Sequence, residues 1–254
     1  MRRVDVLAIG IDPLTVDELN AEVLRLSRQG SCSAVLNVNA HCLNLLRKDE
    51  RLRKFFGQAE IVFSDGAGVV LGARILGRRI PGRITYADWI PNLTALAETE
   101  NLSLFFLGAR PGIAEKASQK LKKQHPSLTI SGALDGYFDH RTGSSDNERI
   151  LQVINVASPD IMLLGMGMPL QERWLMENRE RLNVRVALTG GAVFDYIAGE
   201  LRRGPKFLTD NGFEWLARLA IEPRRLWRRY LIGNPTFLFR VLRQRLSEVR
   251  SSNT

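Results

Sequence analysis

Short apolar runs alternate with longer amphipathic stretches over the first two hundred residues of the chain. Runs such as 34–36, 61–63 and 104–107 are too short for helices and stop at small or polar residues, a pattern typical of buried strands. The stretches between them repeat apolar residues every three or four positions, as helices covering a sheet do. The alternation predicts a three-layer α/β domain with a mainly parallel sheet.

The same pattern locates the other elements. Further strands are predicted at residues 4–9, 161–164 and 184–188, and a strand together with its loop at residues 128–138. Helices are predicted at residues 15–30, 69–76, 87–98 and 147–157, and from residue 171 onward. The first helix should begin with a capping box, because Glu18 follows Thr15 by three residues.

The pattern changes at about residue 205, where the strand signals stop. Residues 201–254 hold twelve basic and four acidic side chains, so they carry +8 of the net charge of +9. We therefore predict a domain over residues 1–200 and a basic α-helical appendage over residues 201–254. This asymmetry of charge suggests an anionic partner for the appendage.

The arginine-rich stretch 222–230 is compatible with three kinds of surface. Its arginines alternate with Leu226, Trp227 and Tyr230. It could form a helix lying on an anionic membrane, an arm supplying cations to a phosphate site, or a nucleic-acid surface. A solvated basic face over an aromatic core is the structural alternative. Because these positions favour a helix with one apolar side, a membrane helix or an arm is preferred over a nucleic-acid surface.

Composition narrows the class of protein. The 254 residues are 44% hydrophobic and 25% charged, which is ordinary for a globular domain with a sizeable core. Cys32 and Cys42 are the two cysteines; they give neither a disulfide framework nor metal-ligand spacing, and fit a reducing compartment. The N-terminus does not resemble a signal peptide, and no apolar stretch is long enough to span a bilayer. We expect a cytoplasmic protein.

The candidate chemistry lies in turns that follow the predicted strands. Strand 61–63 ends at Asp65, and other polar or glycine-rich turns occur at 37–39, 165–172 and 190–191. Turns after parallel strands share one edge of the sheet, where α/β proteins bind ligands, so we expect them to converge on one cleft. Asp65 is then either a general base or the cap of the next helix, and this stretch alone favours the cap.

Five more side chains have two interpretations each. Asn37 and Asn39 can contact a ligand or form the turn. Gln171 suits recognition of a base or sugar hydroxyl, although alone it is more simply a solvated first-turn residue. Arg83 can clamp a diphosphate or remain a solvated loop residue. His41 could be a catalytic residue, but it is more simply a packed or surface histidine. Since no His, Cys and Asp cluster has metal-ligand spacing, arginine, lysine or helix dipoles would have to neutralise phosphate.

These motifs, in this order, resemble the WecG/TagA/CpsF family of bacterial glycosyltransferases over nearly the whole chain. The matching stretches are Asn37-Val38-Asn39-Ala40, Phe63-Ser64-Asp65-Gly66-Ala67-Gly68, Arg83-Ile84-Thr85 with Asp88, Leu107-Gly108, Gly165-Met166-Gly167-Met168-Pro169-Leu170-Gln171-Glu172, Gly190-Gly191, Glu214-Trp215-Leu216-Ala217-Arg218-Leu219 and Glu222-Pro223 to Tyr230. The blocks are specific as a set.

The resemblance implies a Rossmann-like fold and an inverting, metal-independent transfer of a sugar from a UDP-sugar to a polyprenyl-diphosphate-linked sugar. It implies that Asp65 is the general base, and that Arg218, Arg225 and Arg228 of the appendage meet the substrate diphosphate. The other expected substrate-binding residues are Asn37, Asn39, Arg83, Asp88, Gly108, Gly167, Gln171, Glu172 and Gly191. No cofactor and no metal ion is expected.

The family also implies a place and a pathway. We expect a peripheral protein on the inner face of the cytoplasmic membrane, active in cell-surface polysaccharide or teichoic acid synthesis; a homo-oligomer is possible. The donor could carry N-acetylmannosamine, its uronic acid or a hexose. Asn37 stands where many members have Thr, Tyr86 where Gly is usual, and Gly204 where Ala is common. The first two lie near the presumed pocket, so the donor sugar is not fixed by the resemblance.

Two other functions compete with this one. A non-catalytic subunit that binds nucleotide-sugars or lipid carriers would bind UDP without turnover, and the joint presence of Asp65, Arg83 and Gln171 argues against it. A basic nucleic-acid-binding protein would lose affinity steeply with salt. The absence of a recognition motif argues against that second function, so no nucleic acid partner is expected.

Overall fold

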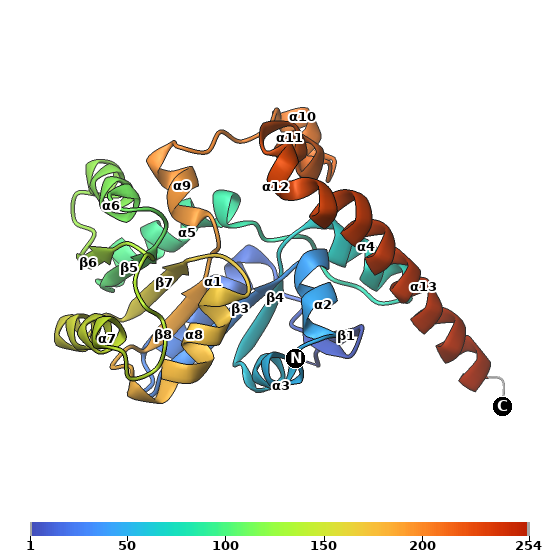
Figure 1. The fold of residues 1–254 in the computed structure, drawn as a ribbon, viewed down its shortest axis with the longest axis horizontal. Coiled ribbons are helices and arrows are strands. Elements are labelled where there is room, and N and C mark those ends of the chain that lie inside the picture. Colours follow the sequence, from blue (N-terminus) through green and yellow to red (C-terminus); the bar gives the residue numbers. More distant parts are fainter. Residues whose placement is uncertain (1, 253–254) are drawn as a thin grey trace. The chain divides into compact units, whose positions relative to one another are not determined.

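The computed structural model describes residues 2–252 and contains a six-stranded sheet in the order β4-β3-β8-β7-β5-β6 (Figure 1). The strands are β3 (Ser33–Val38), β4 (Ile61–Ser64), β5 (Leu104–Gly108), β6 (Ile130–Leu134), β7 (Ile161–Gly165) and β8 (Val186–Thr189). The pairings β3–β8, β8–β7, β7–β5 and β5–β6 are all parallel. The predicted α/β class with a mainly parallel, Rossmann-like sheet is confirmed.

The N-terminal apolar run forms a hairpin, so the single strand predicted at 4–9 is wrong. Strands β1 (Val4–Val6) and β2 (Ile9–Ile11) pair antiparallel. Leu7 and Ala8 between them have φ of 57° and 65°. Two successive left-handed residues give the turn whose twist matches a hairpin. The prediction failed because neither residue is a glycine or asparagine that would mark such a turn.

The chain divides into two compact units. Unit 1 contains Asn37–Thr85 together with the described parts of Met1–Thr15 and Arg202–Thr254. Unit 2 contains Val16–Leu36 and Tyr86–Leu201. The described C-terminal residues therefore form a compact unit with segments from the first third of the chain.

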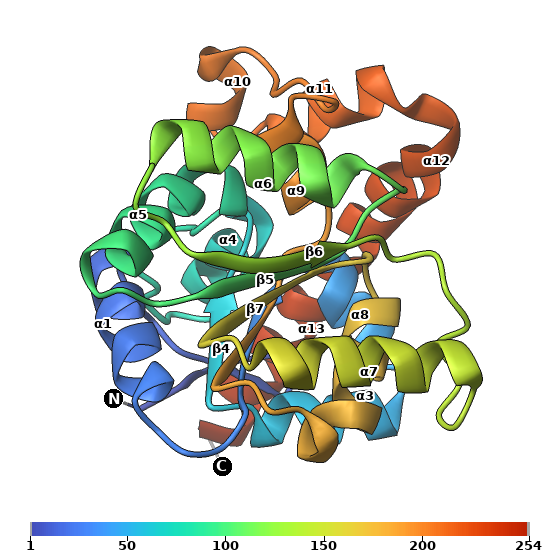
Figure 2. The same cartoon turned by 90° about the vertical axis from the view of Figure 1, so that its left-hand side faces the viewer.

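Unit 2 is built on strands that are buried on both faces. Every residue of β5, β7 and β8 is buried, which explains their continuous apolar sequences. Figures 1 and 2 show α6 and α9 over one face of these strands and α7 and α8 over the other. The helices of this unit are α1 (Val16–Ser27), α5 (Tyr86–Thr99), α6 (Ile113–Gln124), α7 (Ser145–Ala157), α8 (Leu170–Asn178), the short 3-10 helix η1 (Arg179–Arg181) and α9 (Val193–Ala198).

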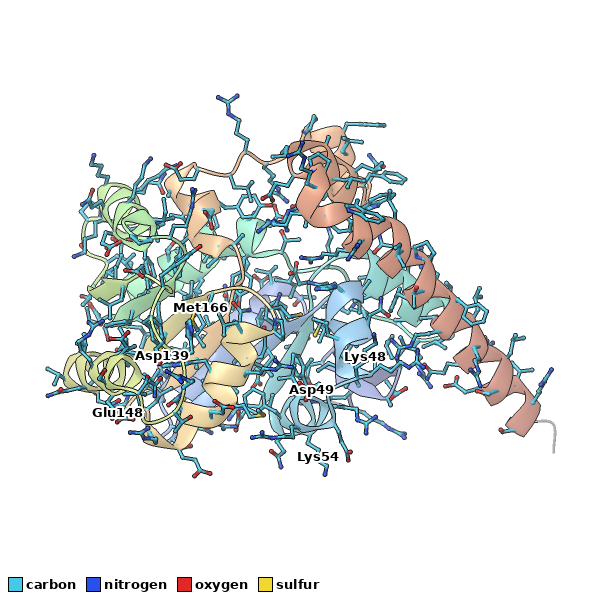
Figure 3. The ribbon with its side chains drawn as sticks, in the orientation of Figure 1. Lys48, Asp49, Lys54, Asp139, Glu148 and Met166 are labelled. Atoms are coloured by element: carbon cyan, nitrogen blue, oxygen red, sulfur yellow. The ribbon has the colours of Figure 1, made fainter. Side chains whose placement is uncertain are left out.

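Acidic residues organise the loop from β6 to α7. The Tyr137 backbone N–H donates to Asp135 Oδ1 at 2.8 Å, and Ser144 Oγ donates to the Asp139 carbonyl at 2.7 Å. Ser144 Oγ also accepts from the Asn147 N–H at 3.2 Å and so caps α7. Figure 3 shows Asp139 in this loop near α7. The Asp135 side chain and the Asp139 backbone carbonyl therefore take part in the turns of this loop.

The helices of unit 1 come from two distant parts of the chain. The first group is α2 (Ala40–Leu46), α3 (Glu50–Gln58) and α4 (Ala67–Ile75). The second group is α10 (Lys206–Asp210), α11 (Glu214–Ile221), α12 (Pro223–Trp227), the π-helical segment η2 (Arg228–Ile232) and α13 (Gly233–Ser252). The predicted helical character of the C-terminal segment is confirmed. Of the helices in the described range, not one combines the length and the apolar character needed to cross a membrane.

Helix α13 packs along α2 and α4 (Figure 1). Phe237 and Val241 are 1% and 0% exposed. A Cβ on Gly72 of α4 would lie 2.8 Å from Cζ of Phe237, so only glycine allows the two helices to approach this closely. Burying one large aromatic side chain contributes about 2–3 kcal/mol, which holds α13 in place.

Polar contacts fix the same helix at both ends. Asn44 Nδ2 donates to the Gly233 carbonyl at 2.8 Å, and Arg240 donates to the Leu43 carbonyl at 2.9 Å near the end of α2. A cation suits the negative end of a helix dipole. Further along, Arg78 donates to Glu248 at 2.8 Å. The described C-terminal residues are thus anchored in unit 1 by apolar and polar contacts together.

The π-helical segment has a cause in the sequence. Pro235 lies inside α13 and has no N–H to donate to the carbonyl four residues earlier, which a regular α-helix would require. The five residues Arg228–Ile232 just before it form the wider π turn. Such turns reorient side chains and are frequent at functional sites.

Candidate active site

Strand β4 delivers Asp65 to the start of α4, and Asp65 does not cap that helix. The Asp65 backbone N–H donates to the Val38 carbonyl at 2.7 Å, which ties the residue to β3. Gly66, with φ of 118°, is the N-cap residue, and it provides no side-chain cap. The Asp65 carboxylate instead accepts from Asn37 Nδ2 at 2.8 Å. The helix-cap interpretation is therefore wrong.

The two asparagines at the end of β3 have different partners. Asn37 is 5% exposed and donates its amide to Asp65. Asn39 is the N-cap of α2, and its Oδ1 accepts from the Cys42 N–H at 3.0 Å. Asn37 thus orients the candidate base, whereas Asn39 stabilises the helix beside it. The sequence left both roles open for both residues.

The surroundings of Asp65 bring its pKa above the usual value of an aspartate. Burial, which removes hydration from the carboxylate, is the main cause, although the residue keeps partial exposure. The Asn37 hydrogen bond lowers the pKa, Glu214 raises it, and Arg229 and Arg218 lower it. A carboxylate whose pKa is shifted towards neutral pH is a better proton acceptor than an ordinary aspartate.

Arg83 connects the loop after α4 to the C-terminal segment. It donates to Glu214 at 2.9 Å and to the Thr209 carbonyl at 2.6 Å. The Arg83 and Glu214 side chains are only 17% and 16% exposed, and Arg203 lies 3.9 Å from the same carboxylate. Arg83 is therefore no solvated loop residue. Its contact with a substrate diphosphate stays a prediction.

The predicted arginines of the C-terminal segment do not all approach Asp65. Arg218 influences the Asp65 carboxylate electrostatically. Arg225 is paired with Glu222 at 2.5 Å and is 63% exposed. Arg228 is exposed and lies over the Trp227 ring, 5.2 Å from its centroid. Their binding of a diphosphate stays a prediction.

Sequence reasoning missed Arg229, which does interact with Asp65. No signal in the sequence distinguishes Arg229 from its neighbour Arg228. Helical spacing does not relate the three arginines to one another, because Arg218 lies on α11, Arg225 on α12 and Arg229 in the π-helical segment, with a break at Glu222 between the first two helices.

His41 lies in the first turn of α2. Burial, and then the nearby Arg229 charge, lower its pKa to about 4. The imidazole is therefore neutral at pH 7 and adds no positive charge near Asp65. The expectation of a packed or surface histidine is consistent with its partial burial.

In unit 2, Gln171 joins two turns through its amide. It is 1% exposed, and its Oε1 accepts from the Gly167 N–H and the Gly191 N–H, both at 3.1 Å. These glycines follow β7 and β8 and have φ of 83° and 59°. The alternative of a solvated first-turn residue is therefore wrong. Contact of Gln171 with a substrate stays a prediction.

Glu172 is a buried acid beside this amide. It is 0% exposed, and its Oε1 accepts from Gln171 Nε2 at 2.7 Å. Burial raises its pKa to about 7, against the lowering effect of the Gln171 hydrogen bond. Within residues 2–252, no group bonds to its buried Oε2. Burial therefore favours the protonated, neutral form of this side chain.

Glycines keep the strand ends of unit 2 free of side chains. Gly108 has φ of 147°, and a Cβ there would lie 2.3 Å from the carbonyl carbon of Gly165. The Ala109 N–H donates to the Gly165 carbonyl at 2.9 Å.

The predicted site residue Asp88 lies exposed in the first turn of α5. The expected convergence of all these turns on one cleft stays a prediction.

Comparison with known proteins places this arrangement in a family. The model of the glycosyl transferase WecG/TagA/CpsF family matches residues 4–251. The chain belongs to this family. It is therefore a glycosyltransferase, as the resemblance predicted.

Three relatives of this WecG/TagA/CpsF member share one name, N-acetylglucosaminyldiphosphoundecaprenol N-acetyl-beta-D-mannosaminyltransferase. The protein of Bacillus spizizenii W23 is 27% identical over 207 residues, covering 82% of this chain and 77% of the relative. That of Bacillus subtilis 168 is 26% identical, covering 84% and 80%. That of Staphylococcus aureus MRSA252 is 24% identical, covering 94% and 92%. This WecG/TagA/CpsF member thus matches most of the length of each.

Among the residues that the structure describes, no group of three or more His, Cys, Asp or Glu side chains could hold a metal ion. The charged groups around Asp65 are one acid, Glu214, and the guanidinium groups of Arg218 and Arg229.

Proposed function

We propose that this glycosyltransferase moves a sugar from a UDP-sugar to a polyprenyl-diphosphate-linked sugar with inversion at the anomeric carbon. The names of the relatives support an N-acetylglucosaminyl-diphosphoundecaprenol acceptor and an N-acetylmannosamine donor. The observation that carries the proposal is Asp65, which accepts from Asn37 at 2.8 Å and whose pKa is lowered by the charges of Arg229 and Arg218 against the raising effect of burial.

Asp65 acts as the general base in this proposal. Its carboxylate accepts the proton of the acceptor hydroxyl as that oxygen attacks C1 of the donor sugar. The bond from C1 to the UDP oxygen breaks on the opposite face, and UDP leaves with the electron pair. General-base assistance contributes about 10²–10⁴-fold in rate. Asn37 keeps one carboxylate oxygen engaged, which leaves the other to meet the hydroxyl.

Arginines take the place of a divalent ion. The leaving diphosphate develops negative charge, which preorganised cations stabilise in the transition state. Arg218, Arg225, Arg228 and Arg83 are the proposed diphosphate-binding residues. A chelator such as EDTA should therefore leave the rate unchanged, and restoration of a lost rate by added Mg²⁺ or Mn²⁺ would refute this part.

Helix α13 offers a surface for the membrane that holds the acceptor. Phe239, Leu242, Leu246 and Val249 are 67%, 49%, 62% and 42% exposed and recur at intervals of three, four and three residues. Exposed arginines flank this apolar stripe. An apolar stripe with basic neighbours suits the cytoplasmic face of a membrane rich in anionic lipid. Replacing Leu242 and Leu246 by Glu should abolish sedimentation with phosphatidylglycerol vesicles.

The decisive experiment offers a set of UDP-sugars with a short-chain lipid-diphosphate N-acetylglucosamine acceptor and identifies the product by mass. Asp65→Asn should lower kcat by at least about 10²-fold while UDP binding persists. Asp49→Asn is the matched control, because Asp49 caps α3 through the Leu52 N–H. Full activity of Asp65→Asn would overturn the role of Asp65. UDP binding without turnover of any donor would favour a binding subunit.

A further inference from the structure

The C-terminal segment brings a charge to Asp65 that the family pattern does not assign. Arg229 belongs to the π-helical segment Arg228–Ile232. The residue is half-buried, and its Nε is fully buried without an acceptor among the described residues. Its guanidinium carbon lies 5.4 Å from the centroid of the Tyr230 ring. Tyr230 is 8% exposed and packs on Trp215 at 5.9 Å between centroids.

The charged and titratable groups that face this guanidinium come from several elements of unit 1. Asp65 follows β4, His41 is on α2, Arg218 is on α11 and Arg225 is on α12. Burial is the main cause that lowers the pKa of Arg229, and Arg218 and Arg225 lower it as well, whereas Tyr230 and Asp65 raise it. His41 is neutral at pH 7, so Asp65 is the only anion among these neighbours.

A second acid, Glu214, affects the pKa of Asp65 in the opposite direction to the arginines. Glu214 raises the pKa of Asp65, whereas Arg229 and Arg218 lower it. Glu214 is itself bonded to Arg83 at 2.9 Å. Glu214 therefore acts on Asp65 with its own charge partly offset by Arg83, while Arg229 and Arg218 act on Asp65 in the opposite direction.

We propose that Arg229 is a positioning residue for Asp65: from the π turn of the C-terminal helix it keeps the carboxylate ionised and able to accept the proton of the acceptor hydroxyl. The two adjacent arginines of the π turn differ in environment: Arg229 is half-buried with a fully buried Nε, whereas Arg228 is exposed over the Trp227 ring. The inference rests on the proposed function of Asp65, yet its electrostatic part can be measured without turnover.

The test combines charge changes of opposite sign. Arg229→Gln removes a cation that favours ionised Asp65, so the acid limb of kcat/KM should move to higher pH. The ratio of variant to wild-type kcat/KM should then rise about threefold or more from pH 6 to pH 9. Glu214→Gln removes an anion that disfavours ionised Asp65 and frees Arg83. The acid limb of kcat/KM for this variant should therefore move to lower pH. Arg229→Lys keeps the charge and should restore the wild-type profile.

Arg224→Gln is the matched control, because Arg224 is an exposed residue of α12 and loses the same charge. Its pH profile should match that of the wild type. A purely structural role of Arg229 would lower kcat equally at every pH, and Arg229→Lys would fail to rescue it. That result would overturn the proposal. Should Arg229→Gln fail to fold, Arg229→Met keeps the aliphatic stem over Tyr230 and is titrated instead.

The pH at which Asp65 titrates can also be measured directly in the full chain without substrate. The ¹³C resonance of the Asp65 carboxyl, assigned by its loss in Asp65→Asn, should titrate at higher pH in Arg229→Gln and at lower pH in Glu214→Gln. An unchanged midpoint in Arg229→Gln would overturn the role of Arg229 even if the transferase assay succeeds. Shifted midpoints in a protein that transfers no sugar would sustain the coupling and overturn only the proposed function.

Discussion

Unit 1 and unit 2 prepare their candidate site residues in different ways. In unit 1 the residues around Asp65 are charged and come from chain segments more than 150 residues apart, such as Asp65 and Arg229. In unit 2 the glycine turns after β7 and β8 are joined by one buried amide, Gln171, which accepts hydrogen bonds from two backbone N–H groups. Proton transfer requires tuned charges, whereas a close approach of ligand to backbone requires glycine.

The two units should therefore lose their site geometry in different ways when they are mutated. A charged cluster assembled from distant segments depends on the helix that carries its cations. A turn locked by one side chain depends on that side chain alone. Four predictions test this difference, beginning with the largest expected effect.

Phe237→Ala should destabilise unit 1 by about 3–5 kcal/mol, because it leaves a cavity between α13 and α4. Phe239 lies two residues further along and is 67% exposed, so Phe239→Ala should change the free energy of unfolding by less than about 0.5 kcal/mol. Urea denaturation of both variants measures the difference. Equal stability would show that α13 is not part of the core of unit 1.

Glu172→Gln should remove a pH dependence of stability that arises in unit 2. The folded-state pKa is raised from 4.5 to about 7, so the wild-type side chain favours folding below pH 4.5 and loses this contribution as the pH rises to 7. The difference amounts to about 3 kcal/mol. The variant should therefore gain stability relative to the wild type between pH 4 and pH 8 in denaturant titrations. A constant difference across that range would contradict a neutral buried Glu172.

Gln171→Met should cost about 2 kcal/mol, because the Gly167 and Gly191 N–H groups lose their shared acceptor. Hydrogen exchange at these two amides should accelerate, while exchange in unit 1 stays as in the wild type. Gln124→Met, at an exposed position at the end of α6, serves as the control. Unchanged protection at both glycines would show that another group locks the turns.

Arg78→Met should have the smallest effect, about 1 kcal/mol, because its ion pairs with Asp5 and Glu248 are partly exposed. The loss should be confined to the far end of α13, where amide exchange reports fraying. Arg79→Met, an exposed neighbour, should show neither change. Global destabilisation of unit 1 would mean that this end of the helix carries more than a local contact.

The elements of the fold followed from the sequence because their apolar periods are strong. The runs at 104–107 and 161–164 are buried on both faces and were predicted as strands. The β1–β2 hairpin was missed because its turn residues Leu7 and Ala8 are not turn formers, and only tertiary packing holds them at positive φ.

The candidate site was predictable only in part, for a physical reason. Asp65 was identified from its strand end and the family pattern, but its partner Asn37 could not be separated from Asn39 by spacing alone. Arg229 could not be separated from Arg228, since which of two adjacent arginines faces Asp65 is decided by a π turn. Pro235, three residues after that turn, lacks the N–H that a regular α-helix would need there.

The close contact of Gly72 with Phe237 fixes the position of α13 along its own axis. Phe237 follows Arg229 by eight residues, or about 12 Å along a helix with a rise of 1.5 Å per residue. The contact at Gly72 therefore fixes the position of the Arg229 guanidinium along the axis of the C-terminal helical segment. Inserting or deleting one residue between positions 230 and 236 would leave the Gly72–Phe237 contact intact but move Arg229 by about 1.5 Å along the helix and turn it by about 100° around the axis.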